Sequence, residues 1–373
     1  MQYIAIFGAS KFGEQVLIFL KEYFPDIRVK FFLDNDKSKQ EFLNMKVFRP
    51  DEVNLNSVKI FVASDYYSEI KKQLINKGLS ENIDFFSSAI LYNAKVDIHS
   101  CQLILKKFEK NDIKYRIVDR KELRKNKSSN KLFIFGSGRT LNDLTEKEIE
   151  HIQQHDSWML NFSNTFKITP TYASFEFVGD KIDYFKKLTS NVKNRDGYPL
   201  TYIKDLHYYS DLHTDFVKKE FDNMPITLDI RLHTKDIESL NSTLHLIKYL
   251  KLDELFSQMN YNLGGVTSVT TVMFHALALG YEEVILCGVD LNKDIYFFEE
   301  SMESVFDKQL AKYPIRIVNK EAVHSTMSEE FTIPADIFIY MINELFFKDE
   351  GISLRIASSK SLLYPKLRLY DFG

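Results

Sequence analysis

Two hydroxyl side chains, Thr267 and Ser268, follow a pair of glycines at positions 264 and 265 and precede an apolar, helix-like stretch that stops at Gly280. Either hydroxyl can cap a helix, because serine and threonine oxygens accept bonds from the first free N–H groups of the backbone. Those N–H groups and the positive end of the helix dipole suit a phosphate. The segment therefore predicts a phosphate-binding helix start, although many helices of α/β proteins begin this way without a ligand.

Small or polar residues also follow three of the predicted strands directly. They are Gly136, Ser137 and Gly138 after residues 131–135, Asn161 and Asn164 after residues 158–160, and Gly288, Asp290 and Asn292 after residues 284–287. Glycines let a backbone approach a ligand closely, and amides can pair with a base edge, a ribose or a sugar hydroxyl. Asparagine after a strand is equally a common turn residue.

Other reactive side chains are few. His324 lies in a polar loop, where a histidine is usually surface but has a near-neutral pKa suited to proton transfer. Cys101 and Cys287 are the only cysteines and cannot form a disulfide framework, and Cys287 is expected to be a buried, inert thiol within its strand. No metal site is predicted, because His207 and His213 lack the spacing of a zinc motif.

The elements that must position these residues form two halves. Residues 3–7 read as a strand, Gly8 to Gly13 as a turn into a helix, and residues 29–33 as a second strand followed by Asp34, where a ribose could bind. The full dinucleotide fingerprint is missing. We expect an α/β fold with a Rossmann-like domain at 1–100, a polar connector at 101–130 and a second domain at 131–373.

Composition narrows the class of protein. The 373 residues are 45% hydrophobic and 27% charged, which is typical of a globular chain, and their formal net charge of −3 argues against a nucleic-acid partner. The first residues enter a strand without a signal peptide's features, and no uncharged apolar run approaches the roughly 20 residues that span a bilayer. A cytoplasmic protein is expected.

The first half resembles the small amino-terminal domain of bacterial sugar O- and N-acyltransferases. The matching segments are Phe7-Gly8-Ala9-Ser10, Phe32-Leu33-Asp34-Asn35-Asp36 and Val47-Phe48-Arg49-Pro50-Asp51-Glu52-Val53. The resemblance implies an accessory module that binds a nucleotide or sugar nucleotide or serves only in packing. No nucleophile, base or metal-ligand set accompanies it.

The second half resembles the bacterial lipooligosaccharide sialyltransferases of glycosyltransferase family 42. The matching series is Gly136-Ser137-Gly138, Asn161, Val266-Thr267-Ser268, Ala278-Leu279-Gly280-Tyr281, Gly288-Val289-Asp290, His324-Ser325 and Ser359-Lys360-Ser361-Leu362-Leu363. The resemblance implies a GT-A-like domain that needs no metal or other obligatory cofactor. It also implies inverting transfer from a CMP-activated sialic acid to a surface-glycan acceptor.

Residue roles follow from that resemblance. His324 would be the general base, and Tyr296 would donate a hydrogen bond to the leaving phosphate. The glycine turn and Asn161 would hold the nucleotide and donor, and Thr267 and Ser268 would lie at the donor carboxylate and phosphate. Three positions depart from the family pattern. Ser137 replaces an asparagine, Gly265 replaces an arginine and Asn292 replaces a tyrosine.

These departures leave the donor open among CMP-activated sialic acid, pseudaminate, legionaminate and Kdo, with a protein acceptor as an alternative to a glycan. A lipid-linked glycan would bring the enzyme to the inner membrane face, while self-association is left open. A non-catalytic nucleotide-sugar sensor or scaffold is a second hypothesis. An NAD(P)-dependent oxidoreductase is a weaker third, because the glycine fingerprint is incomplete.

Overall fold

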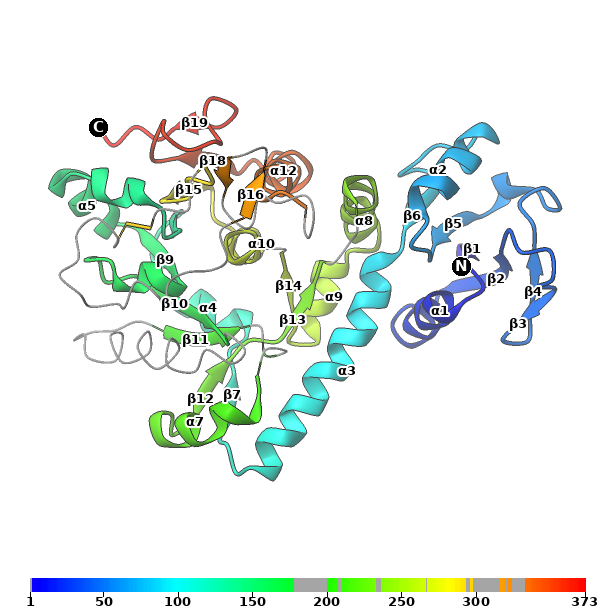
Figure 1. Ribbon diagram of the computed structural model, residues 1–373, viewed down its shortest axis with the longest axis horizontal. Helices are drawn as coiled ribbons and strands as arrows, with labels where there is room; N and C mark the ends of the chain where they lie inside the picture. The colour runs from blue at the N-terminus through cyan, green and yellow to red at the C-terminus, as the bar shows by residue number, and fades with distance from the viewer. Residues whose placement is uncertain are drawn as a thin grey trace. The chain divides into compact units, whose positions relative to one another are not determined.

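The computed structural model describes residues 2–177, 200–204, 206, 209–232, 236–265, 267–292, 296–297, 316–318, 321–323 and 333–373. The chain divides into two compact units (Figure 1). The first contains Met1–His99 together with Ile230–Leu255, and the second contains Ser100–Asp229 together with Phe256–Gly373.

The first unit is built on a six-stranded sheet with the order β3-β4-β2-β1-β5-β6. Its strands are β1 (Gln2–Phe7), β2 (Ile27–Leu33), β3 (Glu41–Phe42), β4 (Met45–Phe48), β5 (Lys59–Val62) and β6 (Phe85–Ser87). All of them pair in parallel except β3 with β4. When the parallel strands β1, β2, β4, β5 and β6 are numbered in chain order, they lie in the sheet in the order 3-2-1-4-5. This is the strand order of a Rossmann-like sheet. Its helical elements include α1 (Lys11–Tyr23), η1 (Leu55–Ser57) and α2 (Tyr67–Asn76).

One helix of this unit comes from much later in the sequence. Helix α8 (Ile237–Leu250) carries buried Ser239, Ser242 and Thr243, and the Ser242 hydroxyl accepts the N–H of Ser87 at 2.9 Å. Ser87 belongs to β6, the edge strand, whose free N–H groups need such partners. The unit therefore differs from the predicted 1–100 domain by including Ile230–Leu255. The sequence does not predict this addition, because a contact between residues 155 positions apart leaves no local signal.

The predicted connector at 101–130 also differs from the structure. It contains the end of α3 (Ala89–Lys110), then β7 (Tyr115–Ile117) and α4 (Arg120–Lys125). Cys101, Ile104 and Phe108 are buried along α3, and Asp119 caps α4 by accepting the N–H of Glu122 at 2.8 Å. The many lysines and arginines mark the exposed faces of these elements rather than a loop.

The second unit is built on a nine-stranded sheet with the order β19-β18-β15-β8-β9-β10-β11-β12-β7. Its other strands are β8 (Lys131–Phe135), β9 (Asp156–Leu160), β10 (Tyr172–Glu176), β11 (Leu200–Lys204), β12 (Met224–Ile226), β15 (Glu283–Cys287), β18 (Ser353–Ile356) and β19 (Arg368–Leu369). Every pairing in this sheet is parallel. Two units built on parallel sheets confirm the predicted α/β fold class.

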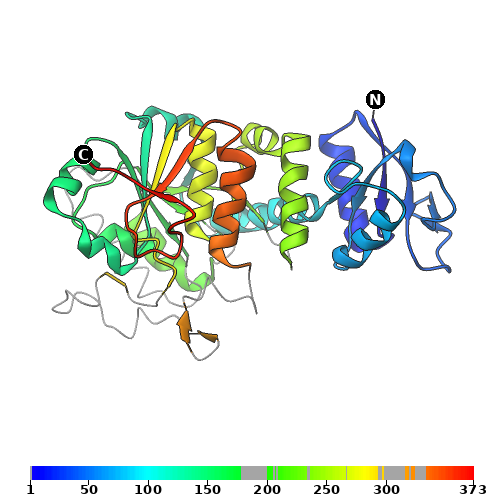
Figure 2. The ribbon, with the colours of Figure 1, turned by 90° about the horizontal axis from the view of Figure 1, so that it is seen from above.

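Helices α10 (Ser268–Leu279) and α12 (Ala335–Ile342) lie side by side in the second unit (Figure 2). The remaining described elements are η2 (Arg139–Asp143), α5 (Glu146–Gln153), η3 (Asn161–Thr165), η5 (Asp211–His213), α7 (Thr214–Glu220), β13 (Asp229–Arg231), α9 (Leu252–Gln258), β14 (Asn262–Gly264), the antiparallel pair β16 (Arg316–Val318) and β17 (Glu321–Val323) and a π-helical turn η7 (Asn343–Phe347). Among the helices of the described ranges, none has the length and apolar character needed to cross a membrane.

Candidate functional site

The strand order of the second unit reverses between β8 and β15. Strands β9, β10 and β11 follow β8 in succession on one side, whereas β15 and β18 lie on the other side. In open parallel sheets, ligands bind in the crevice at the carboxyl ends of the strands where the order reverses. The glycine turn after β8 and the turn after β15 both begin at this point.

These two turns are packed backbone against backbone. The N–H of Gly136 donates to Cys287 O and that of Gly138 donates to Gly288 O, each at 2.8 Å. A Cβ atom at Gly136 would lie 2.4 Å from Gly288 O, and Gly288 itself has a φ of +62°. Glycine is therefore required on both sides of the contact, and the turns can present backbone groups to a ligand.

The buried side chain of Asp290 stabilises the contact between the two turns. Its side chain accepts bonds from the N–H of Thr140 at 2.9 Å and from the Thr140 hydroxyl. Burial raises the pKa of Asp290, and the bonds from Thr140 act against that rise. Both of its oxygens serve the turn, so the described geometry gives Asp290 a positioning role at the predicted donor site.

Tyr296 lies against the same turn. It forms a β-bridge with Gly138, and the N–H of the next residue, Phe297, donates to Ser137 O at 3.0 Å. Its ring centroid is 5.8 Å from that of Phe162. The structure thus brings Tyr296 together with Ser137 and Gly138. Asn292 instead donates from Nδ2 to Lys360 O at 2.6 Å and so links the loop after β15 to the loop after β18.

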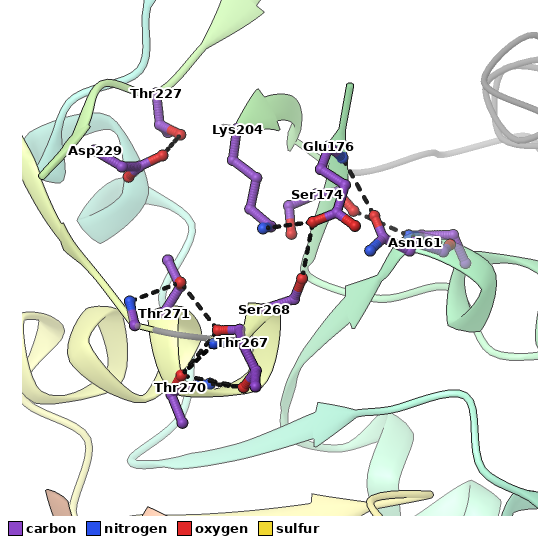
Figure 3. Close-up of polar contacts among 12 residues, drawn as sticks. Asn161, Ser174, Glu176, Lys204, Thr227, Asp229, Thr267, Ser268, Thr270 and Thr271 are labelled. Carbon is purple, nitrogen blue, oxygen red and sulfur yellow. Dashed lines mark hydrogen bonds and ion pairs between the residues drawn. The ribbon is translucent and has the colours of Figure 1, made fainter. Parts of the chain in front are cut away.

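Helix α10 begins as the sequence predicts. Thr267 is the N-cap, its hydroxyl accepts the N–H of Thr270 at 3.2 Å, and Gly280 ends the helix with a φ of +70°. Gly265 is tightly enclosed, because a Cβ atom there would lie 2.1 Å from Thr270 Oγ1. The Thr267 hydroxyl is thus occupied in capping, whereas Ser268 is turned towards β10 (Figure 3).

Asn161 follows β9 directly in the left-handed conformation, with a φ of +46°, and its Oδ1 accepts the N–H of Glu176 at 3.2 Å. Asn164 is fully buried and donates from Nδ2 to Asn161 O at 2.9 Å. Asparagine tolerates this conformation better than most residues. Both amides therefore form the turn, and Asn161 in addition contacts the polar group described next.

Glu176 and Lys204, the final residues of β10 and β11, are not among the residues predicted from the sequence. Glu176 Oε2 lies 3.1 Å from Lys204 Nζ and accepts a bond from the Ser268 hydroxyl at 3.2 Å (Figure 3). A charged residue closing each of two apolar strands was the available signal. This signal is weak, because β11 is short and follows a polar stretch of sequence without an obvious strand pattern.

Two buried groups near the site are chemically inactive. Burial, with smaller contributions from the positive charges of Arg120 and Lys204, lowers the pKa of His275 to about 3, and its ring stacks on Trp158. Burial also raises the pKa of the Cys287 thiol. His275 is therefore neutral in the core, and the prediction of a buried thiol at Cys287 is confirmed.

A cavity of about 390 Å³ adjoins the Gly288 turn on the side of β18. Thr140, Asp143, Ser358 and Lys360 are among its lining residues, and Lys360 Nζ pairs with Asp143 Oδ2 at 2.9 Å. The described part of the chain holds no group of three or more His, Cys, Asp or Glu residues able to bind a metal. The predicted base His324 lies outside the described residues, as does His207.

The glycine turn of the first unit has its own internal partners. Gly8 has a φ of +125°, and the N–H of Ala9 donates to Asp34 Oδ2 at 2.9 Å. The same oxygen lies 2.9 Å from Lys39 Nζ. Asp34, considered above as a ribose ligand, is thus engaged with the turn and with Lys39.

The model of the family described as C2185-like, N-terminal, matches residues 1–83. A search of curated proteins found no match. The α-2,3-sialyltransferase Cst-I from Campylobacter jejuni is similar at 16% identity and a TM-score of 0.38, over 65% of this chain and 81% of that one.

Two further solved structures are similar to the same degree. The sialyltransferase CstII from Campylobacter jejuni, in complex with the substrate analogue CMP-3FNeuAc, has 16% identity and a TM-score of 0.38, over 65% of this chain and 87% of that one. The MAf glycosyltransferase from Magnetospirillum magneticum AMB-1 has 15% identity and a TM-score of 0.38, over 99% of this chain and 57% of that one.

Proposed function

We propose that this protein is an inverting glycosyltransferase that moves an acidic sugar from a CMP donor to a bacterial surface-glycan acceptor. One observation carries the proposal. The glycine turn, Tyr296, the loop to Asp290, the start of α10 and Asn161 all lie at the carboxyl edge of a single parallel sheet, on either side of its reversal point. That edge is where nucleotides bind in such sheets.

The donor would be held mainly by backbone and hydroxyl groups. The backbone of the turn at Gly136 to Gly138 approaches the nucleotide closely, because Ser137 has a glycine on either side. The first N–H groups of α10 with the Ser268 hydroxyl face the phosphate and sugar. Asn161 and Asn164 shape the neighbouring edge. This mode of binding neutralises phosphate with dipoles and needs no metal ion.

The transfer step would be a single displacement. His324 takes the proton of the acceptor hydroxyl, whose oxygen bonds to the anomeric carbon while the bond from that carbon to the CMP phosphate oxygen breaks. Negative charge grows on the departing phosphate, and the Tyr296 hydroxyl donates a hydrogen bond to it. Such donors act most strongly where charge develops in the transition state.

The His324→Ala variant tests the mechanism. A general base contributes roughly 10²- to 10⁴-fold to the rate, so the turnover number for transfer should fall by about that factor. CMP affinity should stay the same, because the imidazole acts on the acceptor. Transfer is measured with purified full-length protein and a panel of CMP-sugars, and affinity by calorimetry with CMP, UDP and GDP.

The variant has a direct control in His99→Ala, which lies on α3 and belongs to the first unit. Full transfer activity in His324→Ala would refute the assignment of the base. Binding of UDP or GDP in preference to CMP would refute the donor class.

A further inference from the structure

A buried lysine at the edge of the second sheet has no role in the mechanism above. Lys204 ends β11, and only 3% of its side chain is exposed. An ammonium group withdrawn from water needs a counter-charge, and Glu176 supplies it at 3.1 Å. Apolar side chains of the same size often stabilise a fold at least as well as a buried ion pair does. The position of this pair beside the donor site therefore suggests a role in binding.

The strand register brings the two charges together. Glu176 and Lys204 are register partners in the parallel pair β10–β11, so their side chains leave the same face of the sheet. The Ser268 hydroxyl at the start of α10 donates to the same Glu176 oxygen, at 3.2 Å (Figure 3). One carboxylate thus joins the lysine to a residue already assigned to the donor.

The start of α10 cannot supply a cation of its own before Thr267. Residue 265 is glycine, and its surroundings exclude even a Cβ atom, which would lie 2.1 Å from Thr270 Oγ1. Hydroxyl and N–H groups alone compensate a carboxylate less well than an ion pair does. Lys204 is a cation that shares the Glu176 carboxylate with Ser268. It is therefore the candidate to supply a positive charge for the carboxylate of the donor sugar.

We propose that Lys204 binds the carboxylate of the acidic sugar and that Glu176 positions the lysine. The pair then selects acidic donors over neutral ones. This inference rests on the proposed function and assigns its donor specificity to two residues.

The test compares a CMP-activated acidic sugar with its carboxamide analogue, which has nearly the same shape and no charge. Full-length wild-type protein should show a value of kcat/KM roughly 100-fold higher for the acid, the size of effect that a desolvated charge pair gives. The double variant Lys204→Met with Glu176→Gln removes both charges together and leaves neither unpaired. Its preference should fall to about tenfold or less.

A matched variant, Lys204→Arg, keeps the positive charge and should retain most of the preference. CMP affinity, measured on every variant, reports whether the nucleotide part of the site is still formed. Equal use of acid and carboxamide by the wild type would overturn the inference without any variant. An unchanged preference in the double variant would overturn it as well, whereas a wild-type protein that uses no CMP-sugar at all would refute the proposed function itself.

Discussion

Gly138 has neighbours that leave no room for a side chain. A Cβ atom there would lie 2.5 Å from Asp290 Oδ2 and 2.7 Å from Gly288 O. Gly138→Ala should therefore push the two turns apart, at a cost of about 1–3 kcal/mol in the free energy of unfolding. CMP binding should weaken roughly tenfold, or about 1.4 kcal/mol, because we propose that the turn holds the nucleotide. Calorimetric titration with CMP measures the change.

The control for this prediction is Gly351→Ala. Gly351 has a φ of +70° and open space around it, so the substitution strains the backbone, by about 1–2 kcal/mol, away from the site. It should lower stability and leave CMP affinity unchanged. Wild-type affinity in Gly138→Ala would show that the turn does not contact the nucleotide.

At the residue scale, the sequence was informative where local chemistry decides the outcome. Thr267 caps its helix and Gly280 ends it as predicted, because capping depends on a few neighbouring residues. Lys204 and Glu176 could not be paired in advance, since their contact depends on the register of two strands 28 residues apart. The roles assigned to His324 and to the donor ligands stay predictions.

Elements show the same division between local and distant information. The opening strand, turn and helix of the first unit were predictable from apolar periodicity and glycine positions. The edge of its sheet was not, because β6 is covered by α8 from residues 237–250. Three hydroxyls on α8, those of Ser239, Ser242 and Thr243, contact Ser87. On a helix considered alone they resemble an ordinary polar stripe.

Ser242→Ala tests how much this helix contributes. The substitution leaves the buried N–H of Ser87 without its acceptor, and an unsatisfied buried donor costs about 1–3 kcal/mol. Urea unfolding followed by far-ultraviolet circular dichroism should show a loss of that size. The same exchange at exposed Ser57, also in the first unit, should change stability by less than about 0.5 kcal/mol. Equal effects at both positions would argue that α8 does not stabilise the sheet.

At the scale of the whole molecule, the second unit includes residues that precede the predicted domain boundary at residue 131. Asp156 at the start of β9 is fully buried and accepts bonds from the N–H and hydroxyl of Ser128, the N–H of Ser129 and the Tyr281 hydroxyl. Strand β7 adds three register pairs to β12. All of these donors except Tyr281 precede residue 131, within the segment that its composition identified as a connector.

A fragment of residues 131–373 should therefore be less stable than one of residues 100–373. The shorter fragment loses three donors to a buried carboxylate, and each hydrogen bond to a charged group is worth about 1.5–3 kcal/mol. Trp158, the only tryptophan, lies fully buried in β9 and reports unfolding of this sheet by fluorescence. Restoring residues 100–130 should raise the urea midpoint well above that of the shorter fragment, whereas Asp156→Asn, which needs fewer charge-assisted donors, should narrow the gap. Equal midpoints for the two fragments would mean that the second unit folds without the segment before β8.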